Sequence, residues 1–413
     1  MTHDSEDRLK NNIPINELQS RWQRCRTLLR QYMPEAGGLL VFSRLNIYYF
    51  TGTFGNGIFW LPPEGRPIFF CRKALERARL ESPLHRILPF RSYVDILKTF
   101  QDTGAHMPPI VAAEMNGLSW ALGEALARHF SNHRFLSADR VIARVRAKKS
   151  EWELEKMRFA GSRHDKCLQQ LLPKVLRVNM TERQVGLALW RILLEEGHQG
   201  LLRMENYGEE VFFGHISAGD SGNYPSVFNG PLGLRGEHPA VPHMGSSAKI
   251  WRTAEPLACD VGFMFEGYQT DKTQIYWSGN PAGIPAKVRA AHDFCIETQE
   301  WVRAGLRPGA LPSELAAHCF ERAKSRGWSE GFMALGDNKV KFIGHGIGLA
   351  IDEYPVLAKG FDAPLEEGGV MAVEPKIGIP GLGMVGVENT FEITQNGGRS
   401  LTGEAYDIIC IHG

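Results

Sequence analysis

The chain has 413 residues, 43% of them hydrophobic, and a formal net charge of +1. This length exceeds one average domain, so we expect two domains with sizeable apolar cores. The near-neutral charge argues against nucleic acid or an anionic membrane as the main partner, and no apolar run reaches the ~18 residues of a membrane span. The seven cysteines are scattered and the N-terminus is polar. Both features predict a cytoplasmic protein with reduced thiols and no signal peptide.

The first part of the chain alternates predicted helices with predicted strands. Apolar side chains recur at helical spacing over residues 14–33, and GGLLVFS at 37–43 is typical of a buried strand. Further predicted strands lie at 58–61, 67–71 and 110–113, and further predicted helices begin near 73 and cover 119–129. This alternation predicts an α/β domain over residues 1–147.

A basic run from Arg140 to Lys149 follows this domain. Immediately after it, Ser150 and Glu153 have the spacing of a capping box, which begins a helix. The run has two interpretations, a nucleic-acid patch or a connection into a new domain. The capping box favours the connection, and we therefore place a second domain at residues 148–413.

The second domain shows a weak internal repeat. Helices are predicted at 150–173, 181–197, 286–304 and 313–327. They form two pairs, and each pair precedes a stretch that carries two carboxylates among strand-forming residues. This order predicts an α+β domain with a pseudo-twofold repeat. A Gly- and Pro-rich stretch at 214–247 is expected to form a long loop at the rim of a pocket.

Two aspartates, Asp260 and Asp271, lie in an apolar, Thr- and Tyr-containing stretch at residues 257–277, a composition that favours strands. Their midpoint lies beside Gly267, where the chain can turn. If a hairpin closes there, the two aspartates face each other across the strands. Carboxylates in that position repel one another, so a cation between them is expected.

A second stretch at residues 370–393 repeats the pattern, because the midpoint of Glu374 and Glu388 lies within a Pro-Gly turn. His345 lies between the two stretches, among three glycines. Four carboxylates and one imidazole predict a site for two metal ions. The alternative, two solvated charged hairpins, is disfavoured because the neighbours are apolar and unpaired buried carboxylates are costly. The glycines around His345 lack the strand-turn-helix order of a dinucleotide loop.

These motifs resemble those of the creatinase, prolidase, aminopeptidase P and methionine aminopeptidase family, the pita-bread metallohydrolases. The matching motifs are Asp260, Gly267-Tyr-x-x-Asp271-x-Thr, His345-Gly-x-Gly, Val-Glu374-Pro and Glu388. Residues 1–147 resemble the creatinase-type N-terminal domain, with Asn46–Gly52 matching its Asn-x-x-Tyr-x-Thr-Gly segment. The resemblance therefore implies a creatinase-like α/β N-terminal domain and a pita-bread catalytic domain.

The resemblance also implies an activity, a peptidase of the Xaa-Pro aminopeptidase or dipeptidase type that acts as a homodimer on a peptide or small molecule. Glu374 would be the general acid/base, and His243 would be a catalytic residue that holds the oxyanion or the substrate. Two divalent ions, Mn, Co or Zn, would be bridged by a hydroxide. The implied metal ligands are Asp260, Asp271, His345, Glu374 and Glu388.

Two positions depart from the family's pattern and leave the substrate open. Asp352 stands where peptidases of the family commonly have a second His, and Gly386 stands where many members have Arg. Asp352 is predicted to bind a cationic group of the substrate. The departures keep two alternatives open: a non-peptidase hydrolase or lyase of the creatinase or dimethylsulfoniopropionate-lyase kind, and a peptide-binding protein with a vestigial site.

Overall fold

The computed structural model describes residues 12–102, 107–205, 209 and 211–412. The chain divides into two compact units, Met1–Arg146 and Ala147–Gly413. This division lies one residue before the boundary at 147/148 that the sequence predicts.

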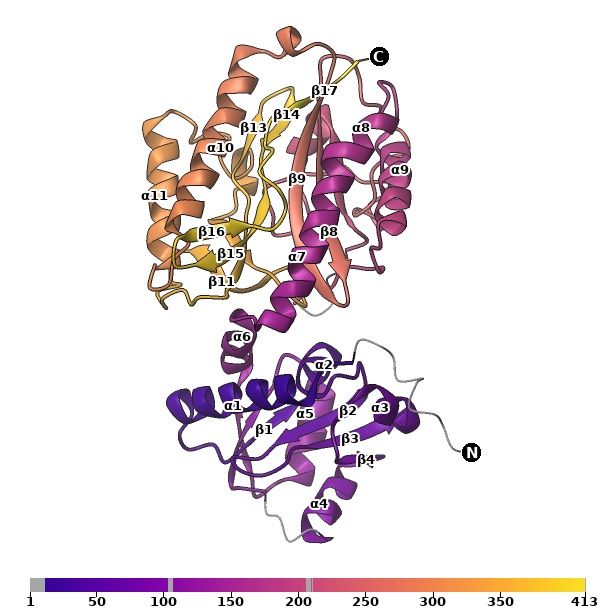
Figure 1. The fold of residues 1–413 in the computed structure, drawn as a ribbon, viewed down its shortest axis with the longest axis vertical. Coiled ribbons are helices and arrows are strands. Elements are labelled where there is room, and N and C mark those ends of the chain that lie inside the picture. The colour runs from indigo at the N-terminus through magenta and orange to yellow at the C-terminus, as the bar shows by residue number, and fades with distance from the viewer. Residues whose placement is uncertain (1–11, 103–106, 206–208, 210, 413) are drawn as a thin grey trace. The chain divides into compact units, whose positions relative to one another are not determined.

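The first unit is built on a six-stranded mixed sheet with the strand order β4-β3-β2-β1-β5-β6 (Figure 1). Strands β1, β2 and β3 pair antiparallel, whereas β4, β5 and β6 each pair parallel with a neighbour. The strands are β1 (Leu39–Val41), β2 (Asn56–Leu61), β3 (Ile68–Lys73), β4 (Ile87–Pro89), β5 (Ile110–Ala113) and β6 (Arg134–Ser137). The helices are α1 (Ile15–Tyr32), α2 (Arg44–Thr51), α3 (Leu75–Glu81), α4 (Tyr93–Asp102), α5 (Trp120–His129) and α6 (Asp139–Ala147). Helices and a central sheet confirm the predicted α/β class.

The segment Asn46–Gly52, which carries the resemblance in this unit, lies in helix α2 and its C-terminal cap. Gly52 ends the helix in a left-handed conformation (φ 78°), which glycine adopts without steric cost. The buried Asn46 amide donates to Glu114 Oε1 at 2.7 Å and accepts from Arg146 Nη1 at 3.0 Å. The motif is therefore structural. It also holds Arg146, part of the basic run, inside the protein and not on a nucleic-acid surface.

The second unit contains a four-stranded sheet, β17-β9-β8-β7, and a five-stranded sheet, β11-β10-β12-β15-β16, with the hairpin β13-β14 as a third ladder. A bridge between Thr273 on β9 and Glu388 connects the two larger sheets. The first sheet has β7 (Gly214–Ala218), β8 (Pro256–Phe265), β9 (Tyr268–Ser278) and β17 (Ile409–Ile411). The others have β10 (Phe342–Gly346), β11 (Glu353–Ala358), β12 (Val370–Val373), β13 (Lys376–Ile379), β14 (Gly383–Gly386), β15 (Asn389–Thr394) and β16 (Gly397–Ser400).

Helices cover these strands on two sides: α7 and α9 on one, α10 and α11 on the other (Figure 1). They are α7 (Glu151–Lys166), α8 (Leu172–Val175), α9 (Glu182–Glu195), α10 (Ala286–Gly305) and α11 (Pro312–Ser325). Capping boxes at Ser150 and Thr181 begin α7 and α9, as the sequence predicts. Antiparallel strands follow each helix pair, so the predicted α+β repeat is present. Among the described residues, no helix is long and apolar enough to cross a membrane.

His198 follows α9 in the chain, and its buried imidazole provides a test of the packing in this unit. His198 Nδ1 accepts a hydrogen bond from the backbone N–H of Met264 at 2.9 Å, and the ring lies between the aromatic rings of Trp190 and Phe263. Burial lowers the pKa of His198 to about 4. The unfolded chain therefore binds a proton below pH ~6.5 that the folded chain does not bind until about pH 4.

We expect the free energy of unfolding to decrease as the pH falls through this window. His198 alone contributes at most roughly 1.4 kcal/mol per pH unit to the decrease. His198→Gln, which keeps a hydrogen-bonding side chain, should have a shallower pH dependence than the parent. Urea unfolding followed by circular dichroism at several pH values measures both slopes. Equal slopes would mean that His198 is already protonated in the fold.

Candidate metal centre

Asp260 and Asp271 are positioned by the hairpin of β8 and β9. Its two-residue turn, Glu266-Gly267, has positive φ at both positions (49° and 87°), as in turns that match the twist of paired strands. This turn pairs Asp260 with Thr273, so the prediction that the two aspartates stand directly opposite one another is wrong by two residues. A shift of two keeps side chains on the same face of a sheet. Both carboxylates therefore still line one side of the hairpin.

Glu374 and Glu388 are positioned by the second hairpin, and here the predicted pairing is confirmed. Strands β12 and β15 pair Val373 with Asn389. The next residues towards the turn of the hairpin, Glu374 and Glu388, therefore stand opposite one another. Beyond them the ladder of β13 and β14 continues in the same register to a turn centred on Gly381, where φ is 72°. The two glutamates therefore lie between two paired segments that fix their separation.

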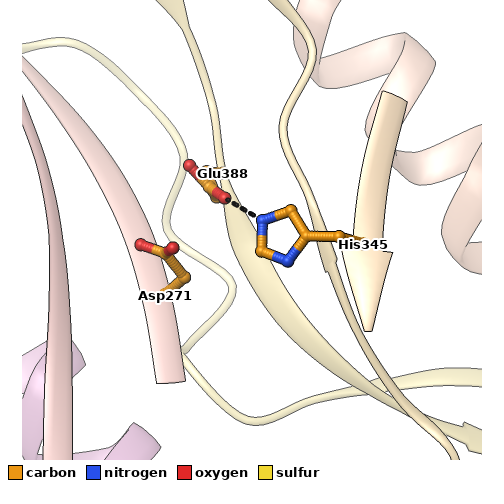
Figure 2. Close-up of side chains that lie close together, drawn as sticks. All are labelled: Asp271, His345 and Glu388. Carbon is orange, nitrogen blue, oxygen red and sulfur yellow. Dashed lines mark ion pairs between the residues drawn. The ribbon is translucent and has the colours of Figure 1, made fainter. Parts of the chain in front are cut away.

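His345, on β10, points at these glutamates from the neighbouring strand. Its Nε2 lies 3.5 Å from Glu374 Oε1 and 3.8 Å from Glu388 Oε1. Figure 2 shows the imidazole and the Glu388 carboxylate turned towards one another, with Asp271 beside them on β9. One ligand atom from each of Asp271, His345 and Glu388 lies within 4.8 Å of the others, which is close enough for all three to hold one metal ion.

A fifth charged group, the ammonium of Lys376, lies in contact with the carboxylates. Burial disfavours the charged form of Lys376, but the carboxylates outweigh it and raise the pKa of Lys376 well above its usual value. Burial opposes ionisation of Asp260 as well, but Lys376 lowers its pKa overall. For Glu374, Glu388 and Asp271, burial and the adjacent carboxylates raise the pKa. Several carboxylates are thus held together at an electrostatic cost that a divalent cation would relieve.

The carboxylates and His345 open onto one cavity of about 380 Å³. Asp352, seven residues beyond His345, lies on the same wall, and its Oδ1 accepts a hydrogen bond from the backbone N–H of Glu205 at 2.8 Å. Burial raises the pKa of Asp352. The apolar lining includes Leu202, Phe228, Phe342, Ile351 and Phe361. The cavity therefore combines apolar side chains with acidic groups beyond the four carboxylates, and Asp352 is one of these.

Two histidines near this cavity differ from expectation. Residues 214–218, which are predicted from the sequence to lie in a loop, form β7 instead. This strand pairs His215 with Asp260 and places it in the cavity lining. His243 does not line the cavity; the ring of Phe228 lies 4.9 Å from His215 and 4.7 Å from His243. The catalytic role of His243 stays a prediction. Asn229 and Gly230 line the cavity, as expected for a loop at its rim.

The donor set suits a divalent metal ion. Carboxylate oxygens with one imidazole nitrogen bind Mn, Co or Zn, and no cysteine is among the described residues that line the cavity, so soft ions are not preferred. Two residues beside these donors, His215 and Lys376, receive no role from the sequence: a site role for His215 is disfavoured, and Lys376 is not singled out. Strand-like alternation at 214–218 and a charged residue within an apolar strand were the signals that could have found them.

A pita-bread fold with four carboxylates and one histidine at the centre of its strands defines a metallohydrolase. The chain belongs to Metallopeptidase family M24, whose model matches residues 155–395. The model of the Creatinase/Prolidase N-terminal domain matches residues 21–148. Membership in this family implies a divalent metal cofactor and a peptidase activity.

Individual proteins similar to this chain agree with that assignment. A Xaa-Pro dipeptidase of Pyrococcus furiosus is 26% identical over 362 residues, which cover 87% of this chain and 91% of that protein. A Xaa-Pro dipeptidase of Lactobacillus delbrueckii is 29% identical over 70% of each chain. Among solved structures, the prolidase from Pyrococcus horikoshii superposes with a TM-score of 0.75 at 20% identity, covering 94% of this chain and 100% of that one.

Proposed function

We propose that the protein is a metal-dependent peptidase that cleaves the bond between an N-terminal residue and proline in short peptides, as an aminopeptidase or a dipeptidase. The observation that carries the proposal is the convergence of Asp260, Asp271, His345, Glu374 and Glu388 on one cavity. The similarity to Xaa-Pro dipeptidases along most of the chain supports the substrate class.

The residues of the cavity have distinct roles in such a reaction. The five ligands would hold a divalent ion, which would supply polarisation of the scissile carbonyl and a lowered pKa of a water molecule. Glu374 lies beside His345 and takes the proton from the attacking water, then returns it to the leaving amine. The aromatic rings of Phe228, Phe342 and Phe361 provide an apolar wall for the proline ring and the adjacent side chain.

The identity and number of the ions are part of this proposal. Oxygen-rich ligands favour Mn or Co, and Zn is compatible with the imidazole. The sequence predicts two ions held by the five ligands, and the contacts of Lys376 with three of these ligands bear on that number.

A panel of peptides tests the proposal directly. Full-length protein loaded with Mn²⁺ or Co²⁺ should cleave Xaa-Pro dipeptides or Xaa-Pro tripeptides, and a chelator should abolish the cleavage. Matched peptides with alanine in place of proline report on the preference. No cleavage of any member by metal-loaded, folded protein would exclude the peptidase proposal.

Asp352 is proposed to bind the free α-amino group of the substrate, because it lines the same cavity as the metal-binding carboxylates and the apolar side chains. Asp352→Asn keeps an acceptor for the N–H of Glu205 but removes the charge. We expect KM for peptides with a free amino end to rise by roughly 10-fold or more, since a hydrogen bond to a charged group is worth about 1.5–3 kcal/mol. Asp352→Ala should weaken binding further, and Asp352→His should raise activity on poor Xaa-Pro substrates.

N-acetylated peptides are the control for this prediction, because they carry no charge at the amino end. Their KM should not rise in Asp352→Asn. If KM for free and acetylated peptides changes equally, Asp352 acts only by holding the backbone of Glu205 in place.

A second candidate function is a hydrolase or lyase that acts on a small cationic non-peptide. It is favoured by Asp352 and Gly386, which replace the His and Arg common in peptidases of this fold. Turnover of such a compound with no cleavage across the peptide panel would establish it.

We also propose that the chain is a cytoplasmic homodimer. All seven cysteines are free thiols, which supports a reducing compartment. On α9, Leu187 is 71% exposed beside an apolar hollow lined by Trp190, Phe212 and Met244, and such a patch supports an interface. Light scattering on the full chain gives the molar mass, and a monomer's mass at micromolar concentration would contradict the dimer.

A further inference from the structure

Lys376 has contacts that are unusual for a lysine. It is the second residue after Glu374 and the first residue of β13, and only 1% of its surface is exposed. Its Nζ lies 3.2 Å from Asp260 Oδ2, 3.1 Å from Glu374 Oε2 and 2.7 Å from Glu388 Oε2. An ammonium has three N–H donors, so each donor has one carboxylate oxygen within reach.

The strand opposite Lys376 explains how its side chain reaches the cluster. Lys376 pairs with Gly386 across β13 and β14. A Cβ atom at Gly386 would lie 3.0 Å from Lys376 Cγ and 2.4 Å from the carbonyl oxygen of Pro375, and φ there is 148°. The backbone of residues 375 and 376 therefore leaves no room for a side chain at position 386. The hairpin therefore carries its basic residue at position 376, across from the position where many members of the family have Arg.

The two glutamates each divide their oxygens between Lys376 and His345. Glu374 and Glu388 both direct Oε2 towards the ammonium, at 3.1 and 2.7 Å. Both direct Oε1 towards His345 Nε2, at 3.5 and 3.8 Å. A carboxylate that bridges two cations offers one oxygen to each of them. In this arrangement one cationic position, next to Asp260, is taken by Lys376, and the other lies beside His345 and Asp271.

We propose that the Lys376 ammonium is a permanent cation of the metal centre, so that the chain holds one divalent ion, at Asp271, His345 and Glu388, instead of two. This inference rests on the proposed metal-dependent function and specifies its cofactor. Four carboxylates, one ammonium and one divalent ion leave a single net negative charge at the cluster. A second divalent ion would have to approach the same oxygens against the charge of the ammonium.

The competing arrangement has two ions and a displaced lysine. In the two-ion arrangement, Lys376 would lose its contacts with three carboxylates, and its ammonium would have to move to another buried position. A buried ammonium without new partners is energetically costly. The two arrangements predict different numbers of bound ions in the same folded chain, so metal analysis distinguishes them.

The experiment counts ions in the full-length protein. The chain is stripped with a chelator, titrated with Mn²⁺ by calorimetry, freed of excess metal and analysed by plasma mass spectrometry. We expect one tightly bound ion per chain, with the electron paramagnetic resonance spectrum of isolated Mn²⁺. Two tightly bound ions, or the spectrum of a spin-coupled pair, would overturn the inference. No bound ion would overturn it too.

Lys376→Met keeps an apolar stem of similar length and removes the charge. It should gain a second tightly bound ion, and a count that stays at one would overturn the inference. The control is Lys272→Met. Lys272 is equally buried on β9, but its ammonium donates to Asn389 Oδ1 and to the carbonyl oxygen of Thr402, both at 2.8 Å, and its ion pair is with Asp165, which is not a predicted metal ligand. Its count should equal that of the parent. If Lys376→Met does not fold, the count and spectrum of the parent decide the question.

The inference and the proposed function can fail separately. A parent that binds two ions and cleaves Xaa-Pro peptides overturns the inference alone. A parent that binds one ion and cleaves none of the panel overturns the peptidase proposal alone.

Discussion

Glu374→Gln is expected to lower the peptidase rate by ~10²–10⁴-fold, the usual loss when a general acid/base is removed. The buried side chain of Glu374 lies between Lys376 and His345 at the cavity. Glutamine has the same shape but cannot accept the proton of the attacking water. The loss should appear in kcat more than in KM, because the substrate's own contacts with the apolar wall and Asp352 are unchanged.

The metal content of the variant separates two causes of that loss. Glu374 is also a predicted ligand, so each preparation needs its metal analysed beside its rate. A metal-loaded Glu374→Gln enzyme with the parental rate would remove Glu374 from the proton-transfer step. Glu374→Asp is the conservative variant, because it retains a carboxylate one methylene further from the cavity. Glu374→Asp should recover part of the peptidase rate, and its rate should depend on pH in the same way as that of the parent.

The sequence predicts the carboxylate cluster well because hairpin geometry is local. The midpoint of Glu374 and Glu388 coincides with a turn that holds the register, and their pairing is confirmed. The same reasoning misplaces Asp260 against Asp271 by two residues. A midpoint alone does not fix which two residues close the turn, and here Glu266 takes a positive φ (49°) that the sequence does not signal strongly. The shift is even, so the face was predicted correctly.

Lys376 and His215 could not be found in the same way, because their positions depend on strands far apart in the sequence. His215 reaches the cavity only because β7 adds to the edge of β8, and the many Gly and Pro residues after it suggested a loop. Lys376 meets Asp260 across more than a hundred residues of chain. A lysine in an apolar strand signals a buried partner, but the sequence does not say which carboxylate it meets.

Glu388→Gln is expected to abolish tight metal binding. The metal affinity should fall by at least about 100-fold, because loss of a residue that only supports a ligand can already cost that much. Glu388 has the closest contact with Lys376, accepts a hydrogen bond from Thr273 Oγ1 at 3.1 Å and belongs to the trio around the proposed ion. An amide at this position cannot donate negative charge to an ion. Peptidase activity should be lost together with the metal, at every peptide concentration.

The matched control is Glu392→Gln, which lies in β15, four residues after Glu388. Glu392 is also buried, but its carboxylate pairs with Arg158 and Arg399. This variant should lose stability and retain the parental number of ions and rate. If it loses metal as well, the effect of Glu388→Gln is a general effect of damage to β15 and not the loss of a ligand.

The stability of metal-free Glu388→Gln should move in the opposite direction from its metal affinity. Burial and the carboxylate of Asp271 raise the pKa of Glu388. Its ionised form therefore destabilises the metal-free fold at neutral pH, and that cost is relieved as the pH falls and the carboxyl takes up a proton. A neutral amide removes the repulsion at every pH. Metal-free Glu388→Gln should thus unfold at the same or a higher urea concentration than metal-free parent at pH 7, and metal should stabilise only the parent. A less stable metal-free variant would mean that the ion pair with Lys376 outweighs the repulsion among the carboxylates.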